Sequence, residues 1–261
     1  MSNDLKTELR DQIIFIVCFI AVWWVVAEMG IVNPKLFPTP GAIGHAFITA
    51  FAENGMISFV GYSMGLIIRG LVIGIGLAFL CSSLAVVNKH FFAIYNLIVS
   101  IMDLLPGVAL LPLVICWVGI GEATIIIIII HSIIWPMSRS LMDGFRAIPN
   151  IYVESGRNIG LRGIRLVTGV YLPAAFASVL SGLRVGWARA WRGLISVEMI
   201  FGTTGTGAGI GWYILMRRVN FDIAGVFGAL IVIIIIGVIV EYGIFRVLER
   251  NTVKKWGMTA Q

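Results

Sequence analysis

The sequence predicts an all-α membrane protein with six transmembrane helices and both termini in the cytoplasm. The chain has 261 residues, of which 59% are hydrophobic and 12% are charged, whereas a soluble domain carries about 25% charged residues. Its mean hydropathy is +0.99, and uncharged runs recur that approach the about 20 residues needed to cross a bilayer. This composition excludes a disordered chain. We expect one transmembrane domain over residues 1–261.

The six predicted spans cover residues 13–29, 57–87, 91–118, 123–142, 174–201 and 223–248. A mixed acidic and basic segment precedes the first span, which argues against a cleaved signal peptide. Trp23 and Trp24 lie toward the far end of that span, where aromatic rings favour the membrane interface. Residues 30–56 form a proline-rich loop that we expect to contain one short helix. Arg69 interrupts the second span, and the stretch from 70 to 88 carries no charge.

Prolines and isoleucines shape the next two spans. Pro106 and Pro112 predict a kink in the third span, because proline removes a backbone donor and clashes with the preceding turn. The break either supplies unwound backbone to a transport cavity or is only a packing kink. The six isoleucines at 125–130 favour a strand by propensity. An open strand cannot satisfy its backbone in lipid, so the sequence predicts a helix there.

The fifth span is the least apolar, because three arginines lie inside it: Arg184, Arg189 and Arg192. Each arginine near a helix centre costs roughly 2.5–3.5 kcal/mol on insertion scales. If the segment crosses nevertheless, 12 Lys and Arg residues fall on the side of the two termini and 3 on the other side. Since cytoplasmic loops carry the excess of basic residues, we predict that it crosses. The sixth span is the cleanest in the chain, with no charge from 223 to 240.

The longest predicted cytoplasmic loop, residues 143–173, has a helix–turn–helix pattern. Glu154 is expected in the first turn of a short helix, and Gly160 supplies the turn. A second helix is expected over 162–172, before Pro173 opens the fifth span. Such a helix pair is either a docking element for a soluble partner or a surface helix held on anionic headgroups by its arginines. The residues alone leave both interpretations open.

The spacing in this loop resembles the signature of permease subunits of bacterial ABC importers. That signature reads Glu-Ala-Ala, three residues, Gly, nine residues, Ile, any residue, Leu-Pro. The chain matches it at four positions: Glu154, Gly160, Leu172 and Pro173. It differs at three positions by small or isosteric changes: Ser155, Gly156 and Val170.

The remainder of the chain resembles one branch of that family, the nitrate, sulfonate, taurine and bicarbonate permeases. The similar phrases are LFPTP at 36–40, GVALLPL at 107–113, WVGIGE at 117–122 and GLRVG at 182–186, together with Trp191 and Glu198. The resemblance implies a type I importer permease fold in the bacterial inner membrane, working by alternating access as a homodimer or, less often, a heterodimer. It also implies two ABC ATPase subunits docked on 143–173 and a periplasmic or lipid-anchored solute-binding protein.

The chain itself is not expected to be an enzyme or to hold a cofactor. It has no Gly-x-x-x-x-Gly-Lys-Ser/Thr loop, so ATP and Mg²⁺ are expected on the partner ATPase. The glycine-rich stretch 202–211 lacks lysine, and close backbone packing or a gate is favoured there over a phosphate cradle. The three cysteines are odd in number and widely spaced, which is typical of reduced packing residues. The sequence does not predict that the chain binds nucleic acid.

Charges inside the spans are the candidates for a translocation path. At about 100° per residue, Arg184, Trp191 and Glu198 share one stripe of the fifth span, and Arg189 and Arg192 lie on an adjacent stripe. A cationic, aromatic stripe of this kind suits a small anion. Alternatively the charges form structural ion pairs, for example Arg184 or Arg69 with Glu198 or Asp103.

His131 lies within the fourth span and completes the set of candidate path residues. A lone histidine there is more often a hydrogen-bonded packing residue than a ligand. No other histidine or cysteine stands at metal-ligand spacing, so no metal site is predicted. A Ser-His hydrolase has little support, because Ser132 is adjacent and projects about 100° away and no nucleophile elbow is present.

The sequence therefore predicts an importer permease for a small, anionic solute such as a sulfonate, taurine, nitrate or bicarbonate. Two alternatives remain. A member of the same family could carry a neutral or cationic nutrient, for example a pyrimidine precursor of thiamine. A secondary transporter driven by an ion gradient would instead show internal repeats and a midplane carboxylate relay, and neither is evident in the sequence.

Overall fold

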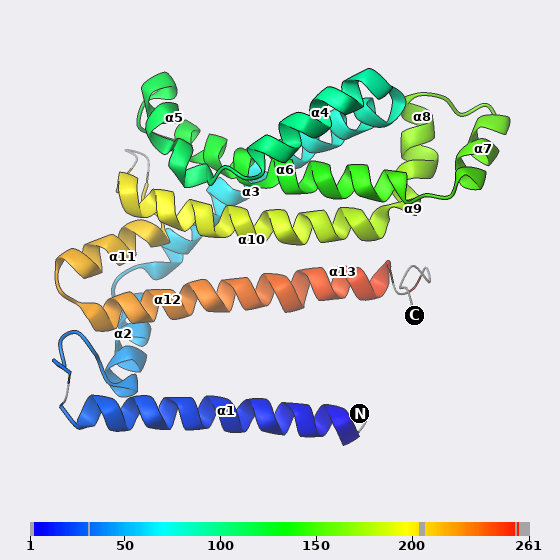
Figure 1. Cartoon of the computed structure of the whole chain (residues 1–261). Helices are drawn as coiled ribbons and strands as arrows, with labels where there is room; N and C mark the ends of the chain where they lie inside the picture. Colours follow the sequence, from blue (N-terminus) through cyan, green and yellow to red (C-terminus); the bar gives the residue numbers. More distant parts are fainter. Residues whose placement is uncertain (1–2, 31, 204–206, 254, 256–261) are drawn as a thin grey trace. The chain divides into compact units, whose positions relative to one another are not determined.

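The described part of the chain has only helices as regular secondary structure and divides into two compact units. The computed structural model describes residues 3–30, 32–203, 207–253 and 255, and no strand occurs among them (Figure 1). The smaller unit comprises the residues up to Ser58 together with Tyr213–Ile234. The larger unit comprises Phe59–Trp212 and the residues from Ile235 onward.

The smaller unit contains α1 (Asn3–Glu28), α2 (Pro40–Ala52), most of α11 (Ile210–Val219) and the first part of α12 (Ile223–Val238). Trp23 of α1 lies at the centre of a group of aromatic residues in this unit. The indole Nε1 donates a hydrogen bond to the Pro38 carbonyl at 3.1 Å, and the ring packs against Phe37 and Phe227 with centroids 5.3 and 5.2 Å away. α2 is the short helix that the sequence predicts within 30–56.

The larger unit begins with most of α3 (Met56–Val87) and ends with η3 (Ile239–Phe245) and α13 (Arg246–Asn251), which continue α12. Between them lie α4 (Lys89–Met102), η1 (Gly107–Leu110), α5 (Leu111–Val118), α6 (Glu122–Arg146), α7 (Asn150–Asn158), α8 (Ile164–Leu166), η2 (Val167–Tyr171), α9 (Leu172–Ala174) and α10 (Phe176–Phe201). α6 and α10 pack along most of their lengths and form the centre of this unit (Figure 1).

Glycines let the neighbouring helices approach α6. A Cβ added to Gly74 of α3 would overlap Cγ2 of Ile133, and one added to Gly186 of α10 would lie 2.5 Å from Cγ1 of the same isoleucine. Small residues of this kind bring helix backbones together in membranes, where lipid supplies no hydrophobic drive for association. Ile133 is fully buried as a result.

The helices agree with the predicted spans in number when bent pairs are counted as single spans. Four helical stretches are long and apolar enough to cross a membrane alone: Arg10–Glu28, Met56–Val87, Glu122–Arg146 and Ile223–Asn251. The other two candidates are the pair Lys89–Met102 with Gly107–Val118, bent by 91°, and the pair Ile164–Ala174 with Phe176–Phe201, bent by 79°.

Both bends correct the predicted geometry. The third span is not a kinked helix, because Pro106 is extended (φ −64°, ψ 124°) and separates α4 from η1. Pro173 does not open the fifth span, because the helix that starts at Ile164 continues through it and the break falls at Ala175. That helix also starts later than predicted, because Gly163 adopts a left-handed φ of 52°.

The role of close packing can be tested within α3. Gly74→Leu is expected to lower the free energy of unfolding by about 1–3 kcal/mol, because the added side chain overpacks the contact with α6. Gly76→Leu is the matched control, since a Cβ there meets nothing within 4 Å. Thermal unfolding of the two purified variants in detergent measures the difference, and equal losses would contradict this account.

Candidate functional site

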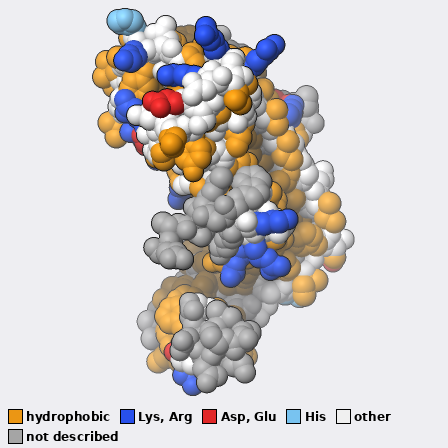
Figure 2. All heavy atoms as spheres, turned by 90° about the vertical axis from the view of Figure 1, so that its right-hand side faces the viewer, with side chains coloured by type: hydrophobic (Ala, Val, Ile, Leu, Met, Phe, Trp, Pro, Cys, Tyr) orange, Lys and Arg blue, Asp and Glu red, His pale blue; other side chains and the backbone are white. Residues whose placement is uncertain are grey.

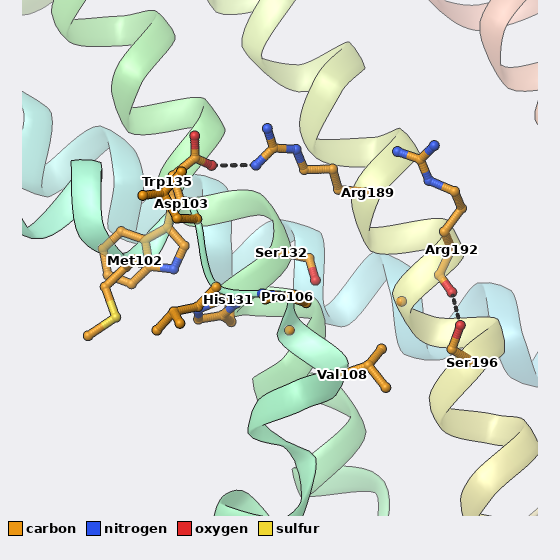
Figure 3. A pocket seen from close by; sticks show the side chains of 14 residues that line it. Met102, Asp103, Pro106, Val108, His131, Ser132, Trp135, Arg189, Arg192 and Ser196 are labelled. Atoms are coloured by element: carbon orange, nitrogen blue, oxygen red, sulfur yellow. Dashed lines mark hydrogen bonds and ion pairs between the residues drawn. The ribbon is translucent and has the colours of Figure 1, made fainter.

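A cavity of about 320 Å³ lies in the larger unit, where the break between α4 and η1 faces α6 and α10. Its lining combines charged, aromatic and hydroxyl side chains with apolar ones. Among the lining residues are Met102, Asp103, Pro106, Val108, His131, Ser132, Trp135, Arg189, Arg192 and Ser196 (Figure 3). His131 and Arg192 lie well inside α6 and α10 respectively. The cavity is therefore located in the interior of two spans rather than at their ends.

An ion-pair network holds the break in place. Asp103 follows the last residue of α4 and accepts a short hydrogen bond from Nη1 of Arg189. Its other oxygen lies 3.5 Å from Nε of Arg139 on α6. One carboxylate with a 13% exposed side chain thus joins α4 to both α6 and α10, and its negative charge is shared by Arg139 and Arg189.

Arg192 is not balanced in this way. It forms no ion pair with any residue in the described part of the chain, and its side chain is exposed on α10 one turn before Ser196. Figure 3 shows Arg189 directed toward Asp103, whereas the side chain of Arg192 extends separately, away from Ser196, whose hydroxyl donates to the Arg192 backbone carbonyl. The cavity therefore presents one positive charge without a counter-ion.

Two other residues that line the cavity carry polar nitrogens without partners among the described residues. Both ring nitrogens of His131 and Nε1 of Trp135 are buried without a hydrogen-bond partner in the described structure, and the two rings pack edge to face at 5.8 Å. The expectation that His131 is a hydrogen-bonded packing residue is thus wrong with respect to the hydrogen bond. An unpaired buried polar group costs about 1–3 kcal/mol, so these groups are suited to bind a polar solute.

The remaining predicted path residues lie outside this cavity. Trp191 is buried and stacks on Trp187, and Arg69 binds Glu122 at 2.9 Å. Arg184 binds Glu241 and Glu249 at 3.0 and 3.1 Å. The expected pairing of Arg184 or Arg69 with Glu198 or Asp103 is wrong, because nearer acidic residues on other helices take those places.

Glu198 is a buried acceptor rather than half of an ion pair. Ser63 of α3 donates its hydroxyl to both carboxylate oxygens at 2.7 and 2.9 Å, and N–H of Gly211 donates at 3.0 Å. The Ser63 oxygen in turn accepts from N–H of Ile210 at 3.0 Å. These bonds join the end of α10 to α3 and to the start of α11.

The same contacts explain part of the glycine-rich stretch. A Cβ on Gly209 would overlap the Glu198 carboxylate, and one on Gly211 would overlap the Ile195 carbonyl. Close backbone packing, the favoured interpretation of this stretch, is therefore confirmed at both glycines. Residues 204–206 of the stretch lie outside the described residues.

The predicted helix–turn–helix is present in the loop 143–173. Gly160 ends the turn after α7 with a left-handed φ of 87°, and Gly156 packs so closely that an added Cβ would lie 2.7 Å from Cγ2 of Val170. Glu154 lies in the middle of α7 rather than in its first turn. Glu154, Ser155 and Pro173 are exposed, and Leu172 is half-buried.

Comparison of the sequence with known proteins identifies the family of the chain. A family model described as "binding-protein-dependent transport system inner membrane component" matches residues 70–254. The taurine transport system permease protein TauC of Escherichia coli (strain K12) is 25% identical over 245 residues, which cover 89% of this chain and 84% of that protein. The nitrate import permease protein NrtB of Synechocystis sp. is 26% identical over 211 residues, or 81% and 71% of the two chains.

The Glu198–Ser63 contact yields a double-mutant prediction. Glu198→Gln and Ser63→Ala are each expected to lower the free energy of unfolding by about 1–3 kcal/mol, because each leaves buried groups unpaired. The double variant should lose less than the sum, with a coupling of about 0.5–3 kcal/mol. Ser196→Ala on the exposed side of α10 is the control, and strictly additive losses would show that the two groups are not coupled.

Proposed function

The chain belongs to the inner membrane components of binding-protein-dependent transport systems, and we propose that it moves a small anion into the cell through the cavity at Arg192. The observation that carries this proposal is the uncompensated charge of Arg192 in a cavity that is also lined by His131 and Trp135, whose ring nitrogens have no hydrogen-bond partner among the described residues. ATP hydrolysis by separate subunits drives the transport by alternating access.

Membership in the family fixes the broader role. The chain is a multi-pass permease subunit of the bacterial inner membrane and not an enzyme, and permeases of this family act with an ATPase and a solute-binding protein. The ATP and Mg²⁺ of the system belong to the ATPase. Both termini of this chain lie in the cytoplasm in our proposal, in keeping with the distribution of its basic residues.

Electrostatics supports an anionic solute. Arg189 shares the Asp103 carboxylate with Arg139. Arg192 has no acidic partner among the described residues, which leaves its charge to be met by something that enters the cavity. Guanidinium groups bind planar and tetrahedral oxyanions through paired N–H donors. Taurine carries a sulfonate group and nitrate is an oxyanion, and both appear in the names of relatives. A neutral or cationic nutrient would leave Arg192 unpaired in the membrane interior.

A second copy of the chain completes the path in our proposal. Arg189, Arg192 and Ser196 are exposed although they lie inside a span, and a charged side chain facing lipid at that depth costs several kcal/mol. Leu104, at the break beside the cavity, is 82% exposed. Covering this face with the same face of another copy removes the charge from lipid and encloses the cavity between two permeases.

The loop 143–173 couples this path to the ATPase. Val153 and Gly156 of α7 face inward, whereas Ile151, Tyr152 and Ile159 are 59–78% exposed. Three exposed apolar side chains on a short helix favour docking against a protein rather than free exposure to water. Glu154 and Ser155 lie on the same exposed surface.

A secondary transporter is the less favoured function. Such a transporter is expected to show internal repeats and a midplane carboxylate relay, and neither is evident in the sequence. Affinity purification of a tagged chain from its native membrane tests the two functions. Recovery of an ATPase and a solute-binding protein supports the importer, and ATP-independent uptake by the chain alone would overturn it.

The role of Arg192 is tested by Arg192→Leu in the assembled transporter. Uptake of the anionic solute is expected to fall about 10–100-fold, because charge-assisted hydrogen bonds contribute about 1.5–3 kcal/mol. Arg250→Leu removes an exposed charge far along the chain and serves as the control. An unchanged uptake profile, with normal assembly, would assign Arg192 a structural role.

The coupling role of the loop is tested by Gly160→Leu. A left-handed conformation costs a residue with a side chain about 1–2 kcal/mol, so the turn after α7 should rearrange. We expect normal membrane insertion but no stimulation of ATP hydrolysis by the loaded solute-binding protein. Asn158→Leu, two residues earlier on the exposed end of α7, is the control. Full stimulation in Gly160→Leu would contradict the coupling role.

A further inference from the structure

A second cavity, of about 380 Å³, lies at the end of α3 in the larger unit. Val86 and Val87 form its α3 side, and the turn between α7 and α8 forms the other side through Arg157, Leu161 and Arg162. Tyr171 of η2 closes it. The transport path described above shares no residue with this cavity.

The cavity is cationic. Arg157 lies in the last turn of α7, Arg162 lies between the two left-handed glycines of the turn, and both side chains are exposed. Neither forms an ion pair with a described residue, and no acidic residue is among those that line the cavity. Lys and Arg side chains also gather over this end of the larger unit in Figure 2.

The cavity lies at the end of an uncharged stretch of helix. α3 carries no charge from Gly70 to its end at Val87, and Val86 and Val87 line the cavity. An uncharged stretch of this length suits the hydrocarbon, so we take this end of α3 to lie near the lipid headgroups. Two valines and Leu161 give an apolar wall on the membrane side, while the two guanidinium groups and the Tyr171 ring line the remainder. An amphiphile with a phosphate between an apolar tail and water matches this division.

We infer that this cavity binds the headgroup phosphate of an anionic phospholipid. Guanidinium groups pair with phosphate oxygens through two N–H donors, and basic pockets beside transmembrane helices are known to take acidic lipid headgroups. A bound lipid would join the end of α3 to the turn that carries Gly160. The lipid would thereby restrict the movement of the loop 143–173, and the exposed apolar side chains of α7 would remain free to contact the ATPase.

Native mass spectrometry of the purified full chain tests this inference, with phosphatidylglycerol as the probe and phosphatidylcholine as the zwitterionic control. We expect the wild-type chain to retain phosphatidylglycerol in preference. The Arg157→Gln/Arg162→Gln variant should bind it about 30-fold more weakly, because each basic side chain near an anionic surface contributes about 1 kcal/mol. Arg165→Gln is the matched control, since Arg165 is an exposed arginine of the same loop outside the cavity lining.

Three results would overturn the inference. One is equal retention of the two lipids by the wild-type chain, which needs no variant to fold. Another is that the Arg157→Gln/Arg162→Gln variant and the Arg165→Gln control both retain phosphatidylglycerol as strongly as the wild-type chain does. The third is complete displacement of the lipid by inorganic phosphate, which would identify a soluble phosphate compound as the ligand. An Arg157→Lys/Arg162→Lys variant should keep most of the binding and shows that the loop remains folded.

Discussion

Close contact of α3 and α10 with α6 positions the other helices of the larger unit and the cavity between them. In lipid, helix association relies on packing and on polar contacts rather than on apolar burial. Gly74 and Gly186 meet the same isoleucine, Ile133, from two sides, so α3 and α10 are both brought against α6. His131 and Trp135, two residues either side of Ile133, are thereby carried to the cavity where α10 places Arg192. A bulkier residue in place of Gly186 would move α10 away from α6 and separate Arg192 from His131 and Trp135.

Charges within the spans divide into two groups with different consequences. Arg69, Arg184 and Arg189 each have a carboxylate partner, and these pairs join helices that are distant in sequence. Such pairs fix helix positions, since a buried charge without a partner is strongly destabilising. Arg192 has no such partner among the described residues. Whether an arginine within a span is paired depends on the acidic residues that the neighbouring helices bring next to it, and not on its depth in the membrane.

The cavity and the loop 143–173 are connected by α10. The bend of 79° at Ala175 turns the loop helix into α10, and α10 carries Arg189 and Arg192 farther along. In the proposed function, movement of the loop against an ATPase would act on α10, which lines the cavity. The Asp103 bridge to Arg139 and Arg189 spans the same region, so displacement of α10 relative to α6 must stretch or break it. An ion pair of this kind can hold one of two states of the transporter.

The sequence by itself determined the class of the protein, the approximate spans and the helix–turn–helix with its glycine at 160. These features depend on local quantities, namely the length of apolar runs, the side on which basic residues fall and the backbone freedom of glycine. The grouping of Arg189, Arg192 and His131 at one cavity, and its distance from Trp191 and Glu198, was decided only by the tertiary structure. A helical stripe places Arg184, Trp191 and Glu198 on one face, but it does not say which helix that face meets. Partners such as Glu241 for Arg184 and Ser63 for Glu198 lie 57 and 135 residues away in the chain, and the bends of 91° and 79° arise where proline geometry and packing combine. Contacts over such separations depend on the three-dimensional path of the whole chain, which no local pattern encodes.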